Sequence, residues 1–194
     1  MTKILVLAAT ALAALTVSAT AFAGGGAYGP PGQPTAEEAT AGTVVIKADK
    51  KGLRFVAPKT IVNGEELKVI SKTDPRKVGP HTFSLVTQGS LPKTPKARQL
   101  CFTPDHICKE IALWHGVKGN GPVKINPVEA GGDGWDTLGS VTKEGDSWFS
   151  GEKAAGTSFS QPVNFDTSAG PTRIYFICAV HSFMQGSINV LPGG

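Results

Sequence analysis

After residue 23 the sequence has no long apolar run, and no later segment is apolar enough to cross a membrane. The excess of one charge over the other is small as well. The 19 Lys and Arg against 15 Asp and Glu leave a net charge of +4, and the basic residues are scattered. This charge is too weak to indicate a nucleic-acid partner, and it supports only a slight preference for acidic partners. No internal repeat is present.

The first 23 residues have the features of an export signal. Lys3 supplies a positive start, residues 4–22 are almost uniformly apolar, and Ala21-Phe22-Ala23 gives the small-x-small pattern of a signal peptidase site. A membrane anchor is the alternative, but the run is short and three hydroxyl residues interrupt it. We therefore predict a signal peptide over 1–23, export to the periplasm or medium, and no stable membrane insertion afterwards. No cysteine stands at the end of the signal, which excludes lipid attachment there.

The rest of the sequence predicts a leader and one β-rich domain. Residues 24–41 are rich in Gly, Pro and Ala and indicate a flexible leader. Residues 42–194 suffice for one domain with a sizeable core. Short β-prone runs divided by turn residues predict strands at 43–48, 53–57, 66–71, 81–86, 158–165, 172–180 and 186–191. This order favours an all-β fold, either a sandwich or a Greek-key barrel.

An insertion at about 89–156 separates these strands into two groups. A threonine cap, a proline at the first helical position and apolar residues at helical spacing predict one helix over 104–115. Residues 131–140 and 143–148 indicate irregular loops. All three tryptophans fall in the insertion, so we expect it to pack against the domain. Disorder of part of the insertion is the alternative.

The three cysteines are an odd number, and a leftover thiol in an oxidising compartment usually has a reason to stay unpaired. Cys101 and Cys108 form a natural pair, and we expect a disulfide that clamps the start of the inserted helix. A second metal site including His106 or His115 is the rival interpretation, although no suitable carboxylate or further Cys-His cluster accompanies it. Cys178 is then either a buried inert thiol or a ligand.

Cys178, His181 and Met184 follow the spacing C-x2-H-x2-M in a short connection between two predicted strands. Strand alternation places Cys178 on the apolar face of its strand, and places His81 on the apolar face where another strand begins. Two imidazoles, a thiolate and a thioether do not suit calcium or magnesium, and match a blue-copper site. Singly, each residue has a structural alternative, as a buried thiol, a satisfied histidine or core filler.

The segment 176–186 resembles the C-terminal ligand loop of the cupredoxins, the plastocyanin/azurin family, with a spacing similar to that of amicyanin. Residues 79–83 resemble the upstream histidine segment of that family. The likeness covers about 42–87 and 157–192 and omits the insertion. It implies a cupredoxin-like Greek-key β-sandwich, one type 1 copper ion and one-electron transfer. Carried over by position, the copper ligands are His81, Cys178 and His181 in the equatorial plane and Met184 on the axis.

Two positions depart from the family pattern. Val180 stands where many relatives have proline, and Thr82 stands where many have an asparagine that pins the ligand loop. Thr82 could still donate a hydrogen bond, so we expect these changes to tune potential and stiffness more than to abolish binding. His181 lies in the loop, and its ring edge is expected at the surface within an apolar docking patch of Ala179, Val180 and Phe183. Ordinary loop packing is the alternative for this patch.

The resemblance and the composition together predict a soluble, monomeric one-electron carrier rather than an enzyme. Its partners would be redox proteins such as a cytochrome c or a membrane or periplasmic oxidoreductase. A copper carrier or storage protein without redox turnover is the alternative, but copper-trafficking surfaces tend to be rich in Met or His, and this chain has 2 Met. A multicopper oxidase or copper nitrite reductase would need further histidine clusters, and the chain has 4 His.

Overall fold

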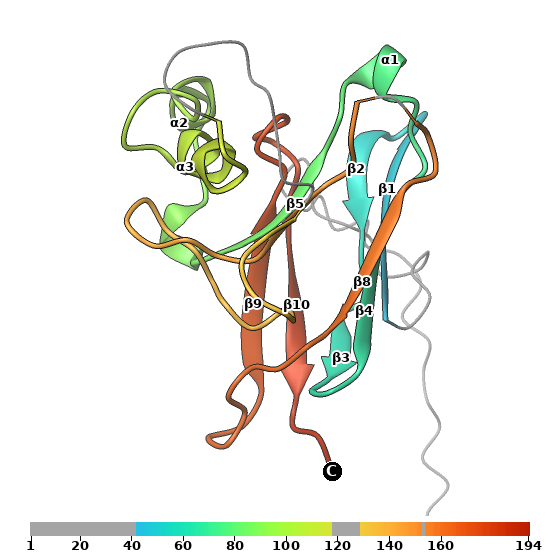
Figure 1. Ribbon diagram of the computed structural model, residues 1–194, viewed down its shortest axis with the longest axis vertical. Helices are drawn as coiled ribbons and strands as arrows, with labels where there is room; N and C mark the ends of the chain where they lie inside the picture. The colour runs from blue at the N-terminus through green and yellow to red at the C-terminus, as the bar shows by residue number, and fades with distance from the viewer. Residues whose placement is uncertain (1–41, 118–128, 153) are drawn as a thin grey trace, which may run out of the picture.

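The computed structural model describes residues 42–117, 129–152 and 154–194. The predicted signal peptide (1–23) and leader (24–41) lie outside the described residues. Two β-sheets pack against each other, and short helices lie at one end (Figure 1). The four-stranded sheet has the order β2 (Gly52–Val56), β1 (Thr43–Asp49), β4 (Glu66–Ser71), β8 (Ser158–Pro162). The six-stranded sheet has the order β3 (Thr60–Val62), β10 (Gln185–Leu191), β9 (Thr172–Ile177), β5 (Thr82–Val86), β7 (Ser147–Phe149), β6 (Glu129–Ala130).

The strand pairing mixes parallel and antiparallel neighbours. In the four-stranded sheet β1 runs parallel to β4 and antiparallel to β2, and in the six-stranded sheet β10 runs parallel to β3 and antiparallel to β9. Neighbours in each sheet are often distant in sequence, because the chain crosses between the sheets. The predicted all-β class is confirmed, and two sheets with few helices are consistent with a cupredoxin-like β-sandwich.

Alternating side chains fill the space between the sheets. In β10, for example, Gly186, Ile188 and Val190 are buried and the residues between them are partly exposed. Three phenylalanine rings meet at the centre: Phe55 contacts Phe83 and Phe176 edge-on, with centroids 5.9 and 5.1 Å apart. We call this cluster the inter-sheet core; its residues include Val44, Ile46, Phe55, Leu67, Val69, Phe83, Leu85, Trp135, Trp148, Ile174, Phe176, Cys178, Met184, Ile188 and Val190.

The insertion supplies two helices, α2 (Pro95–Gln99) and α3 (Ile107–Trp114), beside the six-stranded sheet (Figure 1). A second cluster, the insertion core, covers the outer face of that sheet and consists of Val86, Cys101, Ile107, Cys108, Ile111, Ile177 and Ala179. Every residue of β5 is buried, because its two faces meet the two cores. None of the helices in the described part of the chain is long and apolar enough to span a membrane.

The tryptophans show that the insertion packs closely against the sandwich, as expected. Trp135 and Trp148 are buried in the inter-sheet core, and Trp114 packs against the insertion core. The Trp135 indole N–H donates to the carbonyl of Leu67, 3.0 Å away, which satisfies its polar atom inside the apolar core.

The inserted helix begins later than predicted, at Ile107 with His106 as its N-cap. Asp105 has φ 63°, a left-handed conformation that a right-handed helix cannot continue through. The hydroxyl of Thr103, expected as the cap, instead donates to the Leu100 carbonyl at 2.7 Å. The prediction of a helix from residue 104 is therefore wrong at its start and right at its end.

Several short elements were not predicted. They are α1 (Pro75–Val78), α2 and the strands β3, β6 and β7. Residues 143–148 were expected to be irregular, yet β7 begins at Ser147 and pairs with β5. Predicted strands 158–165 and 172–180 also end earlier, at Pro162 and Ile177. A proline interrupts the first of these, and the second gives way to the turn that carries Cys178.

Candidate metal centre

Three side chains with metal-binding atoms meet where β9 passes into β10. His81 Nδ1 lies 3.9 Å and His181 Nδ1 lies 3.7 Å from Cys178 Sγ. One ligand atom from each of the three residues lies within 4.8 Å of the others. In the described ranges this is the one group of three or more His, Cys, Asp or Glu residues close enough to hold a metal ion. The connection lies at the end of the sandwich opposite the C terminus (Figure 1).

Strand pairing explains why His81 and Cys178 meet. His81 directly precedes β5 and Cys178 directly follows β9, and these two strands are antiparallel neighbours with Ser84 opposite Ile177. The backbone N–H of Thr82 donates to Cys178 Sγ at 3.4 Å, which joins the two strand ends directly. Both His81 and Cys178 are fully buried.

The connection from Cys178 to Met184 is closed by its own backbone. The Cys178 N–H donates to the Met184 carbonyl at 3.0 Å, and the Met184 N–H donates to the His181 carbonyl at 2.7 Å. The Met184 side chain is fully buried in the inter-sheet core, the cluster that also contains Cys178. The loop thus brings a thiol, an imidazole and a thioether into one small turn.

Groups outside the cluster act on both imidazole rings. His81 Nε2 is hydrogen bonded to Thr73 Oγ1 at 2.9 Å, and the backbone of Val78 acts to raise the pKa of His181. Gly79 has φ 80°, a backbone conformation that favours glycine, and it lies beside the His181 ring, where a Cβ would be 3.5 Å from Cε1 in ordinary van der Waals contact. Such partners on the remote side of a ring fix its orientation as a ligand.

Burial determines the protonation of the cluster. It lowers the pKa of His81 to about 4, with a further contribution from the nearby His181. Burial also lowers the pKa of His181, and the Val78 carbonyl acts in the opposite direction. For Cys178, burial raises the pKa of the thiol, against hydrogen bonds from Thr82, His181 and Val180. Neutral imidazoles are the form that binds metals, and a buried thiolate is stable only beside a cation.

The donor set therefore fits a soft, thiophilic cation. Two neutral imidazoles and an unpaired buried thiol converge, with a buried thioether in the same loop, and no carboxylate belongs to the group of His81, Cys178 and His181. Zinc sites seldom use a thioether, and calcium or magnesium would require oxygen ligands. The cluster fits a cupredoxin ligand set, which is suited to copper.

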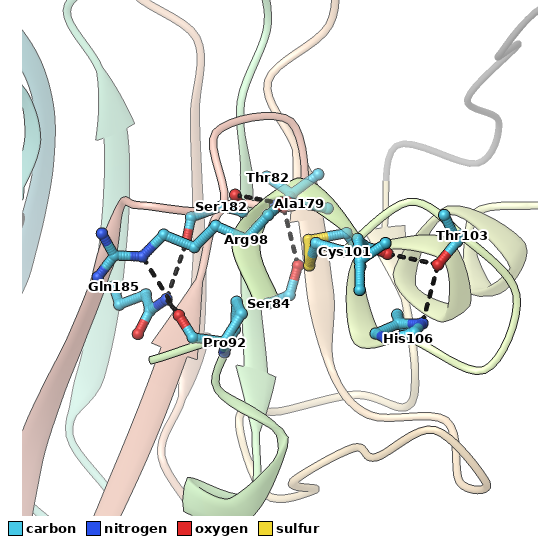
Figure 2. Close-up of a disulfide and its surroundings, with 12 residues drawn as sticks. Thr82, Ser84, Pro92, Arg98, Cys101, Thr103, His106, Ala179, Ser182 and Gln185 are labelled. Carbon is cyan, nitrogen blue, oxygen red and sulfur yellow. Dashed lines mark hydrogen bonds between the residues drawn. A yellow bond between two sulfur atoms is a disulfide. The ribbon is translucent and has the colours of Figure 1, made fainter. Parts of the chain in front are cut away.

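Thr82 pins the ligand loop, although it does so mainly as an acceptor. Its Oγ1 accepts a hydrogen bond from the Ala179 N–H at 2.8 Å, shown beside the disulfide in Figure 2. Ala179 is only 3% exposed, so its place in the predicted docking patch is wrong: its methyl group packs in the insertion core. Val180 and His181 are half-buried, and Phe183 is 39% exposed with its ring 5.9 Å from that of His181.

The insertion also fastens the far side of the ligand loop, which the sequence did not indicate. The Ser182 hydroxyl donates to the Arg98 carbonyl at 3.2 Å, and Gln185 Nε2 donates to the Pro92 carbonyl at 3.0 Å (Figure 2). Arg98 Nε donates to the same Pro92 carbonyl at 3.2 Å. Residues 92–98 thus form a clamp on the loop, and we refer to them as the clamp segment.

The predicted disulfide between Cys101 and Cys108 is present (Figure 2). Neither sulfur is then a thiolate, which removes the basis for a second metal site beside them. His106 Nδ1 is hydrogen bonded to Thr103 Oγ1 at 3.0 Å, and His115 Nε2 to Ser147 Oγ at 2.8 Å.

Comparison with known proteins adds little to this geometry. No protein-family model matches the sequence, and no curated protein matches it. Among solved structures, the chain is similar to the crystal structure of Na-dithionite reduced auracyanin from the photosynthetic bacterium Roseiflexus castenholzii. The match covers 77% of this chain and 95% of that chain, at 11% identity and a TM-score of 0.37. A likeness this distant carries no argument about function.

Proposed function

We propose that this protein is a type 1 (blue) copper protein that serves as a soluble one-electron carrier outside the cytoplasm. The observation that supports it is the convergence of one sulfur and two imidazole nitrogens within 4.8 Å, at a cysteine that forms no disulfide. His81, Cys178, His181 and Met184 would hold the copper ion. When bound, copper would supply a one-electron redox couple.

The surrounding residues are suited to holding such a site still during electron transfer. Thr73 orients His81, and Thr82 ties the start of the ligand loop to β5. Because each hydrogen bond lies outside the ligand cluster, the arrangement persists whichever charge the site carries. A site that moves little on gaining an electron transfers it with a small reorganisation.

His181 offers the route to a partner. It is half-buried, and Val180 and the exposed ring of Phe183 lie beside it. A small apolar surface of this kind suits brief docking of a redox protein, such as a cytochrome c or a membrane or periplasmic oxidoreductase. We propose that the protein acts as a monomer and is not an enzyme.

Colour tests the copper assignment. Adding Cu(II) to the metal-free protein should produce one equivalent of an intensely coloured complex, through thiolate-to-copper charge transfer, that bleaches on reduction. Cys178→Ser should remove the colour. The matched control is Cys101→Ser with Cys108→Ser, which removes two sulfurs and should retain it. A colourless copper complex, or full colour in Cys178→Ser, would overturn the assignment.

Electron exchange tests the carrier role separately. Mixing the reduced copper protein with oxidised cytochrome c should give rapid reoxidation, with the copper retained. Tight and selective transfer of Cu(I) to an acceptor, without such exchange, would instead identify a copper carrier or storage protein. Met184→Leu should keep the colour and raise the reduction potential, since a weak donor to Cu(II) would be replaced by an apolar group.

A further inference from the structure

A chain of hydrogen-bonded side chains crosses the outer face of β5, between the insertion and the ligand loop. His115 Nε2 lies 2.8 Å from Ser147 Oγ, Ser147 Oγ lies 2.7 Å from Ser84 Oγ, and Ser84 Oγ donates to Thr82 Oγ1 at 2.9 Å. All four side chains are at most 1% exposed. We call them the hydroxyl chain.

Strand geometry aligns these residues. Thr82 and Ser84 are two apart in β5 and share its outer face, whereas His81 and Phe83 share the inner one. Ser147 lies directly opposite Ser84 in the β5–β7 pair. His115 is the C-cap residue of α3, so the insertion contributes the far end of the chain. Buried polar groups on a sheet face otherwise covered by apolar residues are costly unless paired, which these are.

The near end of the chain reaches the proposed copper ligand. Thr82 contacts the Cys178 sulfur through its backbone N–H, at 3.4 Å. Thr82 Oγ1 additionally accepts the Ala179 N–H at 2.8 Å. The same residue therefore joins the hydroxyl chain to both the ligand and the loop that carries it.

Counting protons fixes the direction of the chain. Each hydroxyl has one proton, and Ser84 gives its proton to Thr82. Ser147 must then donate to Ser84, and His115 must donate to Ser147 through a hydrogen on Nε2. The Thr82 oxygen accepts two hydrogen bonds, one from Ser84 and one from the Ala179 N–H. Every donor of the hydroxyl chain consequently points toward Thr82, whose backbone N–H donates to the sulfur, and hydrogen bonds aligned in one direction strengthen one another.

We propose that the hydroxyl chain sets how strongly the Cys178 sulfur donates electrons to copper, so that Ser84, Ser147 and His115 are positioning residues for the redox centre. Donors aimed at a thiolate stabilise its negative charge and weaken its donation to the metal. This favours Cu(I) over Cu(II), because the reduced site carries less positive charge. The proposal rests on the proposed copper function, and it gives the insertion a role in tuning the potential.

The test is to interrupt the hydroxyl chain by removing one of its hydroxyl groups. Ser84→Ala removes the donor to Thr82, and should shift the Cu(I)/Cu(II) equilibrium toward Cu(II) on the order of tenfold, ~59 mV in reduction potential. Ser147→Ala acts one bond further away, so a shift of about threefold is expected. Both should move the charge-transfer band to lower energy, since the sulfur becomes more electron-rich. Ser84→Thr keeps the hydroxyl and should restore both readouts.

A matched control separates tuning from loosening of the insertion. Ile111→Val trims the insertion core without touching a hydroxyl, and should lower stability while leaving the potential and the band unchanged. An unchanged potential and band in a folded Ser84→Ala protein would overturn the proposal. A shift in Ile111→Val as large as that in Ser84→Ala would also overturn it.

One measurement distinguishes failure of this proposal from failure of the copper assignment. In the metal-free protein, imidazole 15N NMR should find the hydrogen of His115 on Nε2. That tautomer supports the direction of the chain even if the protein proves to bind no copper. A neutral ring with its hydrogen on Nδ1 would reverse the last donor and overturn the proposal, whatever the colour of the copper complex.

Discussion

The inter-sheet core and the insertion core differ in composition and in what they hold, and they meet at two consecutive residues. The side chain of Cys178 belongs to the inter-sheet core and that of Ala179 to the insertion core. Aromatic rings from both sheets fill the first, and a disulfide with small and aliphatic side chains fills the second. The sandwich thus brings the candidate ligands together, and the insertion restrains the loop that carries Cys178, His181 and Met184.

This difference indicates two separable levels of stability. The inter-sheet core involves strands from both sheets, so damage there should unfold the whole domain. The insertion core lies on one outer face, so damage there should first loosen the insertion and the ligand loop. The following substitutions and conditions test that separation, beginning with the largest expected effect.

Phe176→Ala should lower the free energy of unfolding by about 3–5 kcal/mol, the usual cost of deleting a buried phenylalanine ring. The ring contacts Phe55 and Phe83, with centroids 5.1 and 4.7 Å away. Chemical denaturation followed by circular dichroism would measure the loss. Ile177→Val, one residue along and facing the insertion core, is the control and should cost about 0.5–1.5 kcal/mol. Equal losses in the two variants would contradict the separation.

Acid should destabilise the metal-free protein because the buried His81 must be protonated. The pKa of His81 is lowered from 6.5 to about 4 by burial, so between these values the unfolded chain binds more protons than the folded one. Stability should be complete above about pH 6.5 and fall, by up to about 3 kcal/mol, as the pH approaches 4. The pKa of His181 is also lowered and acts with the same sign. Denaturation midpoints measured across this pH range should depend less on pH in His81→Gln than in the unmodified protein.

Removing the disulfide should act on the insertion core. Cys101→Ser with Cys108→Ser frees a loop closed by residues 7 apart, which corresponds to about 2–3 kcal/mol in the chain-entropy description. Hydrogen exchange should show faster opening of α3 and of the ligand loop, with the strands of the inter-sheet core still protected. Uniformly faster exchange in both sheets would show that the two cores unfold as one unit.

Ser182→Ala should have the smallest effect, about 1 kcal/mol or less, because one hydroxyl bond to the Arg98 carbonyl is lost. Amide exchange in the ligand loop should rise while α3 stays protected. The control is Ser160→Ala, which removes an exposed hydroxyl bond to Glu66 in the four-stranded sheet. If both variants left loop exchange unchanged, the clamp segment would have no measurable hold on the loop.

The sequence allowed the ligand cluster to be anticipated because its signals are local. Strand alternation put Cys178 and His81 on inner faces, and the C-x2-H-x2-M spacing from Cys178 to Met184 gave one compact turn. Most strands followed from the same alternation. A strand of three residues such as β7 is too short to show a period, and Asp105 ended the predicted first turn of the helix through its backbone conformation alone.

What the sequence did not indicate depends on how the insertion packs. Ala179 appeared to be a loop residue at the surface, and it is buried only because the disulfide region covers it. Ser84 is an ordinary strand residue by sequence, and Ser147 falls in a segment predicted to be irregular. Their hydrogen bond requires β7 to pair with β5, and the bond from His115 to Ser147 requires α3 to end above them. Contacts between segments about 30 to 60 residues apart leave no periodic signature.

The clamp segment also bears on how the ligand loop could be reused in protein engineering. Ser182 and Gln185 donate to the carbonyls of Arg98 and Pro92, so two hydrogen bonds of the loop end in a part of the chain far away in sequence. A loop of this kind is not an independent cassette. Grafted alone onto another β-sandwich, it would carry donors without their acceptors. A designer transferring its geometry would need to transfer residues 92–98 as well.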